Sequence, residues 1–246
     1  MKKYIIALII AVLPVLGFAS EGGAKLEKAD VDLNDTASLQ RGARLFVNYC
    51  LSCHSANYMR YSRMAKDLGL SDKQVANNLM FASDKVGSLM TIAMRPEESK
   101  NWFGNTPPDL SVEARARGAD WLYTYLKSFY LDPSRPFGVN NVVFKDVAMP
   151  DVLWELHGLK EPIYKEHKNP EGKIVKKVVG LKTVQPGTMT DVEYDRAVRD
   201  LVNFLVYMGE PAKLQRPYVG FGVLLFLALL FVVSYYLKKE YWKDIH

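Results

Sequence analysis

The sequence predicts a mainly α-helical domain that is exported from the cytoplasm and held by one C-terminal transmembrane helix. Two observations lead to this fold class: an apolar segment stands at each end of the 246-residue chain, and apolar residues recur at helical spacing between them. The composition, 49% hydrophobic and 24% charged, excludes a disordered or collagen-like chain and a polytopic channel. With only two cysteines, no disulfide framework is available to stabilise the fold.

The N-terminal segment has the pattern of a secretory signal peptide. Lys2 and Lys3 precede an apolar run over 4–18, and small residues at Gly17 and Ala19 lie just before Ser20. An uncleaved anchor is the alternative, but the run is short for spanning a bilayer. We therefore predict a signal peptide over 1–19 and a mature chain that begins at Ser20.

The C-terminal segment over 218–237 contains 20 residues without a charge. At about 1.5 Å per residue a helix of this length spans roughly 30 Å, the thickness of the hydrocarbon core of a bilayer. A buried helix of a soluble core is the alternative, although such a helix usually keeps a polar face. Three lysines in the tail over 238–246 predict that the tail stays in the cytoplasm.

This topology puts residues 20–217 outside the cytoplasm. The segment carries 27 basic and 25 acidic residues, so its net charge is only +2 although the whole chain has a pI near 9.0. The basic pI therefore gives no reason to expect a nucleic-acid partner.

Both cysteines fall in one pentapeptide, Cys50-Leu51-Ser52-Cys53-His54. This Cys-x-x-Cys-His pattern is the haem-attachment signature of c-type cytochromes: the two thiols add to the haem vinyl groups and the adjacent imidazole binds the iron. The motif predicts one covalent haem c, bound through Cys50 and Cys53 with His54 as the proximal ligand. We expect the exported segment to fold as a class I cytochrome c-like haem domain with insertions.

A Cys-x-x-Cys pair has two other common uses, in thiol–disulfide oxidoreductases and in zinc sites. A thiol–disulfide oxidoreductase site normally opens a helix after a strand, whereas here a helical pattern precedes the motif. A zinc site needs a fourth ligand and usually a second Cys or His pair, and none stands at a suitable spacing.

The sixth iron ligand is less sharply defined by the residues alone. Met149 lies in an irregular segment and is followed by Pro150, which forces an extended backbone suited to a loop that approaches a haem face. Met189 is the second candidate, followed by Met90 and Met94. Ligation by His and Met fills both axial positions and suits electron transfer.

Four helices are predicted in the exported domain. One over 36–49 leads into the haem motif, and one over 190–208 begins with a capping box, Thr190 to Glu193. These two helices are expected to cross, with Gly42 permitting a close approach. The other two are predicted over 71–82 and 111–130.

The segment over 157–182 differs from its surroundings. It contains seven lysines and three glutamates, and Asn169-Pro170-Glu171-Gly172 has the composition of a turn. We predict an inserted β-hairpin here, solvated by its charges.

With these residues in hand, the chain resembles the cytochrome c1 family, the haem c subunit of bacterial ubiquinol–cytochrome c reductase. The resemblance covers essentially the whole chain. The segment Asn105-Thr106-Pro107-Pro108-Asp109-Leu110-Ser111, followed by Arg115-Ala116-Arg117, is more specific to this family than the haem motif itself.

The resemblance implies roles for further residues. Met149 becomes the axial ligand opposite His54, Arg117 matches an arginine that pairs with a haem propionate, and Pro108 matches a proline near the haem edge. Trp121 stands where relatives often have tyrosine, so this position supplies no phenolic hydroxyl to a propionate.

The resemblance also implies the function. A Rieske iron–sulfur protein, associated with cytochrome b in the inner membrane, would pass single electrons to this haem, and a periplasmic cytochrome c would accept them. The chain alone makes and breaks no substrate bonds. The alternatives are a cytochrome c subunit of a terminal oxidase, a free membrane-tethered carrier, and a haem enzyme or gas sensor with an open sixth position.

Overall fold

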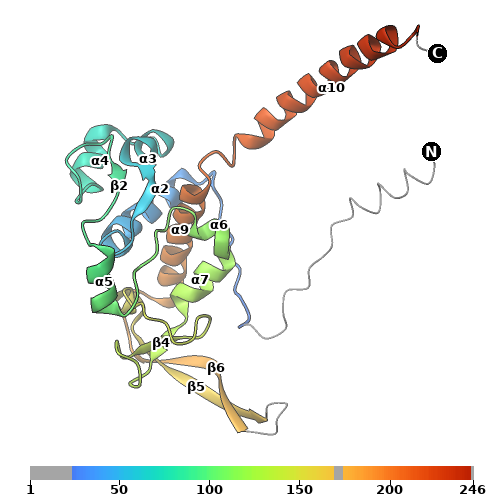
Figure 1. The fold of residues 1–246 in the computed structure, drawn as a ribbon. Helices are drawn as coiled ribbons and strands as arrows, with labels where there is room; N and C mark the ends of the chain where they lie inside the picture. Colours follow the sequence, from blue (N-terminus) through green and yellow to red (C-terminus); the bar gives the residue numbers. More distant parts are fainter. Residues whose placement is uncertain (1–23, 169–173, 245–246) are drawn as a thin grey trace.

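The computed structural model describes residues 24–168 and 174–244 (Figure 1). The predicted signal peptide over 1–19 and the predicted hairpin turn over 169–172 lie outside these residues. The described part is mainly helical with three two-stranded antiparallel sheets, and the predicted fold class is confirmed.

The helices of the described residues are mostly short. Only two exceed ten residues, and these are the two that end the chain. The helices are α2 (Thr36–Leu45), the π-helical turn η1 (Phe46–Cys50), α3 (Tyr61–Asp67), α4 (Asp72–Asn78), α5 (Pro96–Phe103), α6 (Glu113–Arg117), α7 (Ala119–Lys127), α8 (Trp154–His157), α9 (Asp191–Gly209) and α10 (Arg216–Tyr241). The strands are β1 (Ala56–Arg60), β2 (Leu89–Met90), β3 (Phe129–Leu131), β4 (Val139–Asn141), β5 (Leu159–Lys168) and β6 (Ile174–Gln185).

The crossing of α2 and α9 forms the centre of the domain, as predicted. A Cβ atom added to Gly42 would meet the backbone of Asp200 and would lie 2.7 Å from Cβ of Phe204, so only glycine fits at this crossing. Beside it, the rings of Phe46 and Phe204 pack with centroids 5.5 Å apart. Arg41 on α2 also forms a 2.5 Å ion pair with the buried carboxylate of Asp200.

The helix caps read from the sequence are present. Thr190 and Glu193 form both hydrogen bonds of a capping box at the start of α9, and Ser71 and Gln74 do the same at α4. Each box satisfies amide groups that have no partner inside the helix. These caps fix where the two helices begin.

The prediction of one continuous helix over 111–130 is wrong. The chain forms α6 and α7 with a break at Gly118, whose φ of +91° is open to glycine and strained for other residues. After α7 the chain becomes strand β3, which pairs with β4. Residue periodicity alone did not reveal the break, because both helices bury apolar residues.

The predicted β-hairpin is present as β5 and β6, which pair from Leu159 opposite Gln185 to Lys168 opposite Ile174. Figure 1 shows the hairpin projecting from the end of the domain that lies away from α10. The apolar helix α10 has no buried residue, and its composition and length are sufficient to cross a membrane.

Candidate functional site

A cavity of about 380 Å³ lies beside the α2–α9 crossing, a size usual for ligand sites. Its wall is mainly apolar and brings together five segments of the chain: the haem motif, the segment around Pro108, helices α6 and α7, the loop that contains Met149, and the α9 residues Leu201 and Leu205. All six residues predicted to contact the cofactor line this cavity: Cys50, Cys53, His54, Pro108, Arg117 and Met149.

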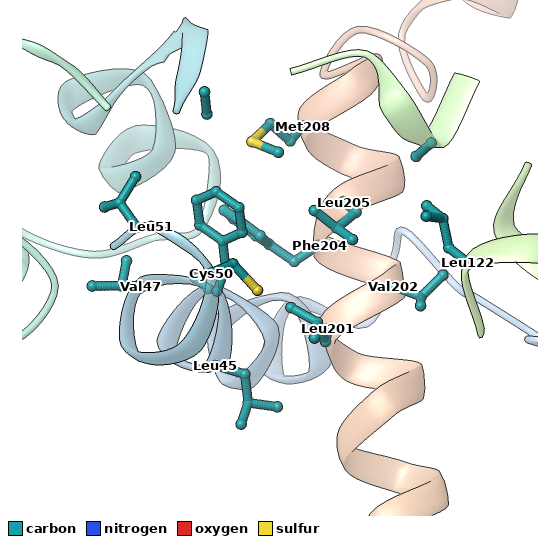
Figure 2. Close-up of a cluster of buried hydrophobic side chains, with 14 of the residues drawn as sticks. Leu45, Val47, Cys50, Leu51, Leu122, Leu201, Val202, Phe204, Leu205 and Met208 are labelled. Carbon is teal, nitrogen blue, oxygen red and sulfur yellow. The ribbon is translucent and has the colours of Figure 1, made fainter. Parts of the chain in front are cut away.

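The two thiols belong to the turn that ends the first helix. Helix α2 continues as the π-helical turn η1, which ends at Cys50, and both cysteines are free. Figure 2 shows Cys50 facing the α9 side chains Leu201 and Phe204. Burial, together with the charge of Cys53, raises the pKa of the Cys50 thiol to about 12. A thiol–disulfide oxidoreductase needs the opposite shift, so this environment argues against that use of the pair.

The imidazole of His54 is fixed through one of its two nitrogens. Nδ1 lies 2.7 Å from the carbonyl oxygen of Pro108, and because a carbonyl only accepts, Nδ1 carries the proton. Burial lowers the pKa of His54, which favours the neutral ring. Nε2 is thereby left with its lone pair, which is the state in which histidine binds a metal.

The segment around Pro108 is held against the haem motif by hydrogen bonds. The carboxylate of Asp109 accepts from the amide of Asn57 at 2.8 Å. The hydroxyl of Ser111 accepts from the amide of Tyr58 at 3.0 Å. These bonds position the Pro108 carbonyl opposite His54, so the physical role of the segment is to orient the imidazole.

The loop that contains Met149 is anchored on both sides. Before it, Oδ1 of the buried Asn140 accepts from the amide of Asp146 at 2.8 Å. After it, Asp151 pairs with the buried ring of His157 at 3.1 Å. The Met149 thioether reaches the cavity wall between these anchors. Of the described methionines, Met149 is the only one on that wall; the second candidate, Met189, packs partly buried against the core.

Arg117 lies at the cavity with its guanidinium over two aromatic rings. It is 4.7 Å from the centroid of Trp121 and 5.6 Å from that of Phe144. Its Nε also donates to the carboxylate of Glu113 at 2.9 Å. The guanidinium is therefore placed to bind an anionic group in the cavity, although Glu113 neutralises part of its charge.

Sequence reasoning missed several residues of the cavity wall. Tyr125 on α7 stacks on Trp121, with centroids 5.0 Å apart, and its hydroxyl lies 3.2 Å from the sulfur of Met149. The two aromatic residues stand four apart, so they share a helix face. That spacing was visible in the sequence, but which face points toward the haem motif depends on the fold.

The donor set fits haem c. Two thiols of the Cys-x-x-Cys-His motif, a neutral imidazole with one free nitrogen, and a thioether line one apolar cavity with an arginine on its wall. Zinc and thiol-exchange chemistry use no such thioether and need no apolar cavity of this kind. The helical fold and this site define the class of protein, a c-type cytochrome.

Comparison with known proteins identifies the family. The model of the Cytochrome C1 family matches residues 28–245, so the chain belongs to the cytochrome c1 family. Cytochrome c1 of Allochromatium vinosum is 51% identical over 100% of both chains. A protein of Nitrosomonas europaea named ammonia monooxygenase gamma subunit is 48% identical, over 100% of this chain and 98% of its own length. A Bradyrhizobium diazoefficiens protein named cytochrome b/c1 is 26% identical over 86% of this chain and 34% of its own length.

Membership of this family makes the protein a c-type cytochrome of electron transport, with haem c as its cofactor. The apolar helix α10 agrees with a membrane anchor.

Proposed function

We propose that the chain is the membrane-anchored electron-transfer subunit of a quinol–cytochrome c reductase, with haem c bound through Cys50 and Cys53 and with His54 and Met149 as axial ligands. One observation carries the proposal: an imidazole with a free nitrogen and a thioether, 95 positions apart in the chain, meet on one apolar cavity beside two thiols. When bound, haem c supplies a single reversible one-electron centre.

The residues of the chain determine what this centre can do. His54, held by the Pro108 carbonyl, and Met149, held by its anchored loop, would fill both axial positions of a bound haem and would leave no position open for a substrate. The apolar wall excludes water, and the thioether favours the reduced state, which raises the potential. Arg117 would hold a propionate, and Pro108 would lie at the haem edge. The chain thus sets a potential and presents an edge for electron transfer.

The partners that we propose are cytochrome b and the Rieske iron–sulfur protein as donor, and a periplasmic cytochrome c as acceptor. Family membership supports them, as does a relative whose name joins cytochrome b and c1. We propose the corresponding topology: a signal peptide over 1–19, a periplasmic haem domain over 20–217, a span of the inner membrane over 218–237, and a cytoplasmic tail over 238–246. The lysines of the tail support this orientation.

The ligand assignment is tested by replacing Met149 with leucine in the full-length protein. The wild type should be low-spin and show the far-red charge-transfer band of sulfur-ligated ferric haem. Met149→Leu should lose that band and lower the potential by on the order of 100 mV, within the range of about 0.8 V over which axial ligands act. Met189→Leu is the matched control and should change neither. An unchanged band and potential in Met149→Leu would refute the assignment.

The complex is tested by native purification from mild detergent. Recovery of cytochrome b and a Rieske protein with the chain would support the reductase. Three other results would contradict the reductase assignment: recovery of oxidase subunits, recovery of the chain alone, or recovery of monooxygenase subunits, which the name of the Nitrosomonas relative suggests. Ready binding of carbon monoxide by the reduced wild type would instead favour a haem enzyme or gas sensor.

A further inference from the structure

The hydroxyl group of Tyr125 donates a hydrogen bond to the sulfur of Met149 at 3.2 Å. Among the described residues no other side chain forms a hydrogen bond with this sulfur. The tyrosine is only 9% exposed, and a tyrosine hydroxyl ordinarily keeps its proton throughout the neutral range. A buried hydroxyl that finds a thioether as its partner is a specific arrangement, since tyrosine hydroxyls in cores usually pair with oxygen.

Tyr125 is held in place by two contacts of its ring and one hydrogen bond to its backbone. It stacks on Trp121 with an interplanar angle of 9°, and it meets Phe129 edge-on with centroids 5.1 Å apart. Nδ2 of the buried Asn141 also donates to the Tyr125 carbonyl at 2.8 Å. The same asparagine accepts, through Oδ1, from the amide of Val143 at 2.9 Å, at the start of the loop that contains Met149. One side chain therefore ties the donor helix to the acceptor loop.

We infer that Tyr125 is a positioning residue that raises the reduction potential of the haem through its hydrogen bond to the axial sulfur. The inference rests on the proposed function, because it requires Met149 as the ligand. A thioether sulfur has two lone pairs, so one can bind iron while the other accepts from the hydroxyl.

The direction of the effect follows from the electron demand of the two iron states. Ferric iron draws more electron density from the sulfur than ferrous iron does. The hydroxyl withdraws density from the same atom, so its hydrogen bond disfavours the ferric state and makes reduction easier. The bond also restrains rotation of the flexible thioether, which keeps one lone pair aimed into the cavity.

The test compares two tyrosine-to-phenylalanine variants of helix α7 in the full-length holoprotein. Tyr125→Phe removes the hydroxyl and keeps the ring that stacks on Trp121. Tyr123→Phe is the matched control: Tyr123 is also buried, its hydroxyl contacts Lys127 at 3.3 Å, and it does not line the cavity. Both variants are measured by redox titration and by the far-red absorption band.

Tyr125→Phe should lower the potential by about 28 mV, a threefold shift of the ferric–ferrous equilibrium at 59 mV per tenfold, with the band retained but displaced. Tyr123→Phe should leave both unchanged. Equal potentials in wild type and Tyr125→Phe, with the band present, would overturn the inference alone. Absence of the band from the wild type would instead refute Met149 as the ligand and with it the proposed function.

A second measurement needs no variant and covers the case in which Tyr125→Phe does not accumulate. In the reduced, diamagnetic wild type, the hydroxyl proton of Tyr125 should exchange slowly with water and show a nuclear Overhauser effect to the methyl group of Met149. A slowly relaxing Met149 methyl signal without that cross-peak would contradict the hydrogen bond.

Discussion

At the scale of single residues, we expect the charge of Arg117 to affect the reduction potential of the haem. Its guanidinium lies on the cavity wall over Trp121, and its partner Glu113 offsets part of its charge. A positive charge beside a haem disfavours the oxidised, more positive state of the iron. Arg117→Gln should therefore lower the reduction potential, by no more than about 1 kcal/mol of driving force because the side chain is 44% exposed.

Arg115 provides the control for this prediction. It stands on the same short helix, α6, but lies beside Gly209 at the end of α9 and does not line the cavity. Redox titration of Arg115→Gln should give the wild-type potential. Equal shifts in the two variants would mean that a general loss of charge, and not the position of Arg117, sets the effect.

The residues that sequence reasoning found and missed differ in how local their signal is. Cys50, Cys53 and His54 belong to one contiguous motif, so their role in haem attachment can be predicted before the fold is known. The hydrogen bond from His54 ends on the backbone carbonyl of Pro108, and no side-chain pattern encodes a carbonyl position. Tyr125 was missed because only the packed fold brings α7 against the Met149 loop.

At the scale of elements, the crossing of α2 and α9 depends on Gly42. A methyl group there would overlap the backbone of Asp200, and backbone cannot move aside as a flexible side chain can. Gly42→Ala should lower the free energy of unfolding by about 3 kcal/mol and weaken haem retention, because Leu201 and Leu205 of α9 line the cavity.

Thermal unfolding of the holoprotein measures this effect, and Gly87→Ala is the matched control. An added Cβ at Gly87 meets nothing within 4 Å, so that variant should unfold at the wild-type temperature. If Gly42→Ala is as stable as Gly87→Ala, the two helices can move apart at this crossing without lowering the free energy of unfolding.

Helix starts were easier to predict than helix continuity. The capping boxes at Ser71 and Thr190 are local sequence patterns, and both helices begin where the boxes indicate. The break at Gly118 requires a positive φ, and the segment on either side of it keeps helical periodicity. The strands β3 and β4 were not predicted, since each has only three residues and depends on its partner.

At the scale of the whole molecule, the haem domain and α10 meet at a short junction. The junction over 210–215 is turn-like, and an ion pair of 2.8 Å joins Arg216 to Glu210 across it. Within residues 24–168 and 174–244, every buried core residue precedes this junction and none lies on α10. The domain thus has its own core, and α10 has the character of an anchor rather than of a packed helix.

A chain that ends at Gln215, with residues 1–19 retained, tests this division together with the proposed topology. It should appear in the soluble periplasmic fraction with the wild-type haem spectrum and potential, because the cavity lies entirely before the junction. It should no longer co-purify with membrane subunits in wild-type yield. The full-length chain is the control and should resist extraction from membranes by alkaline buffer. A truncated chain that stays in the membrane would mean that residues 1–19 remain as a second anchor. A truncated chain that is made without haem would mean that α10 takes part in folding the haem domain.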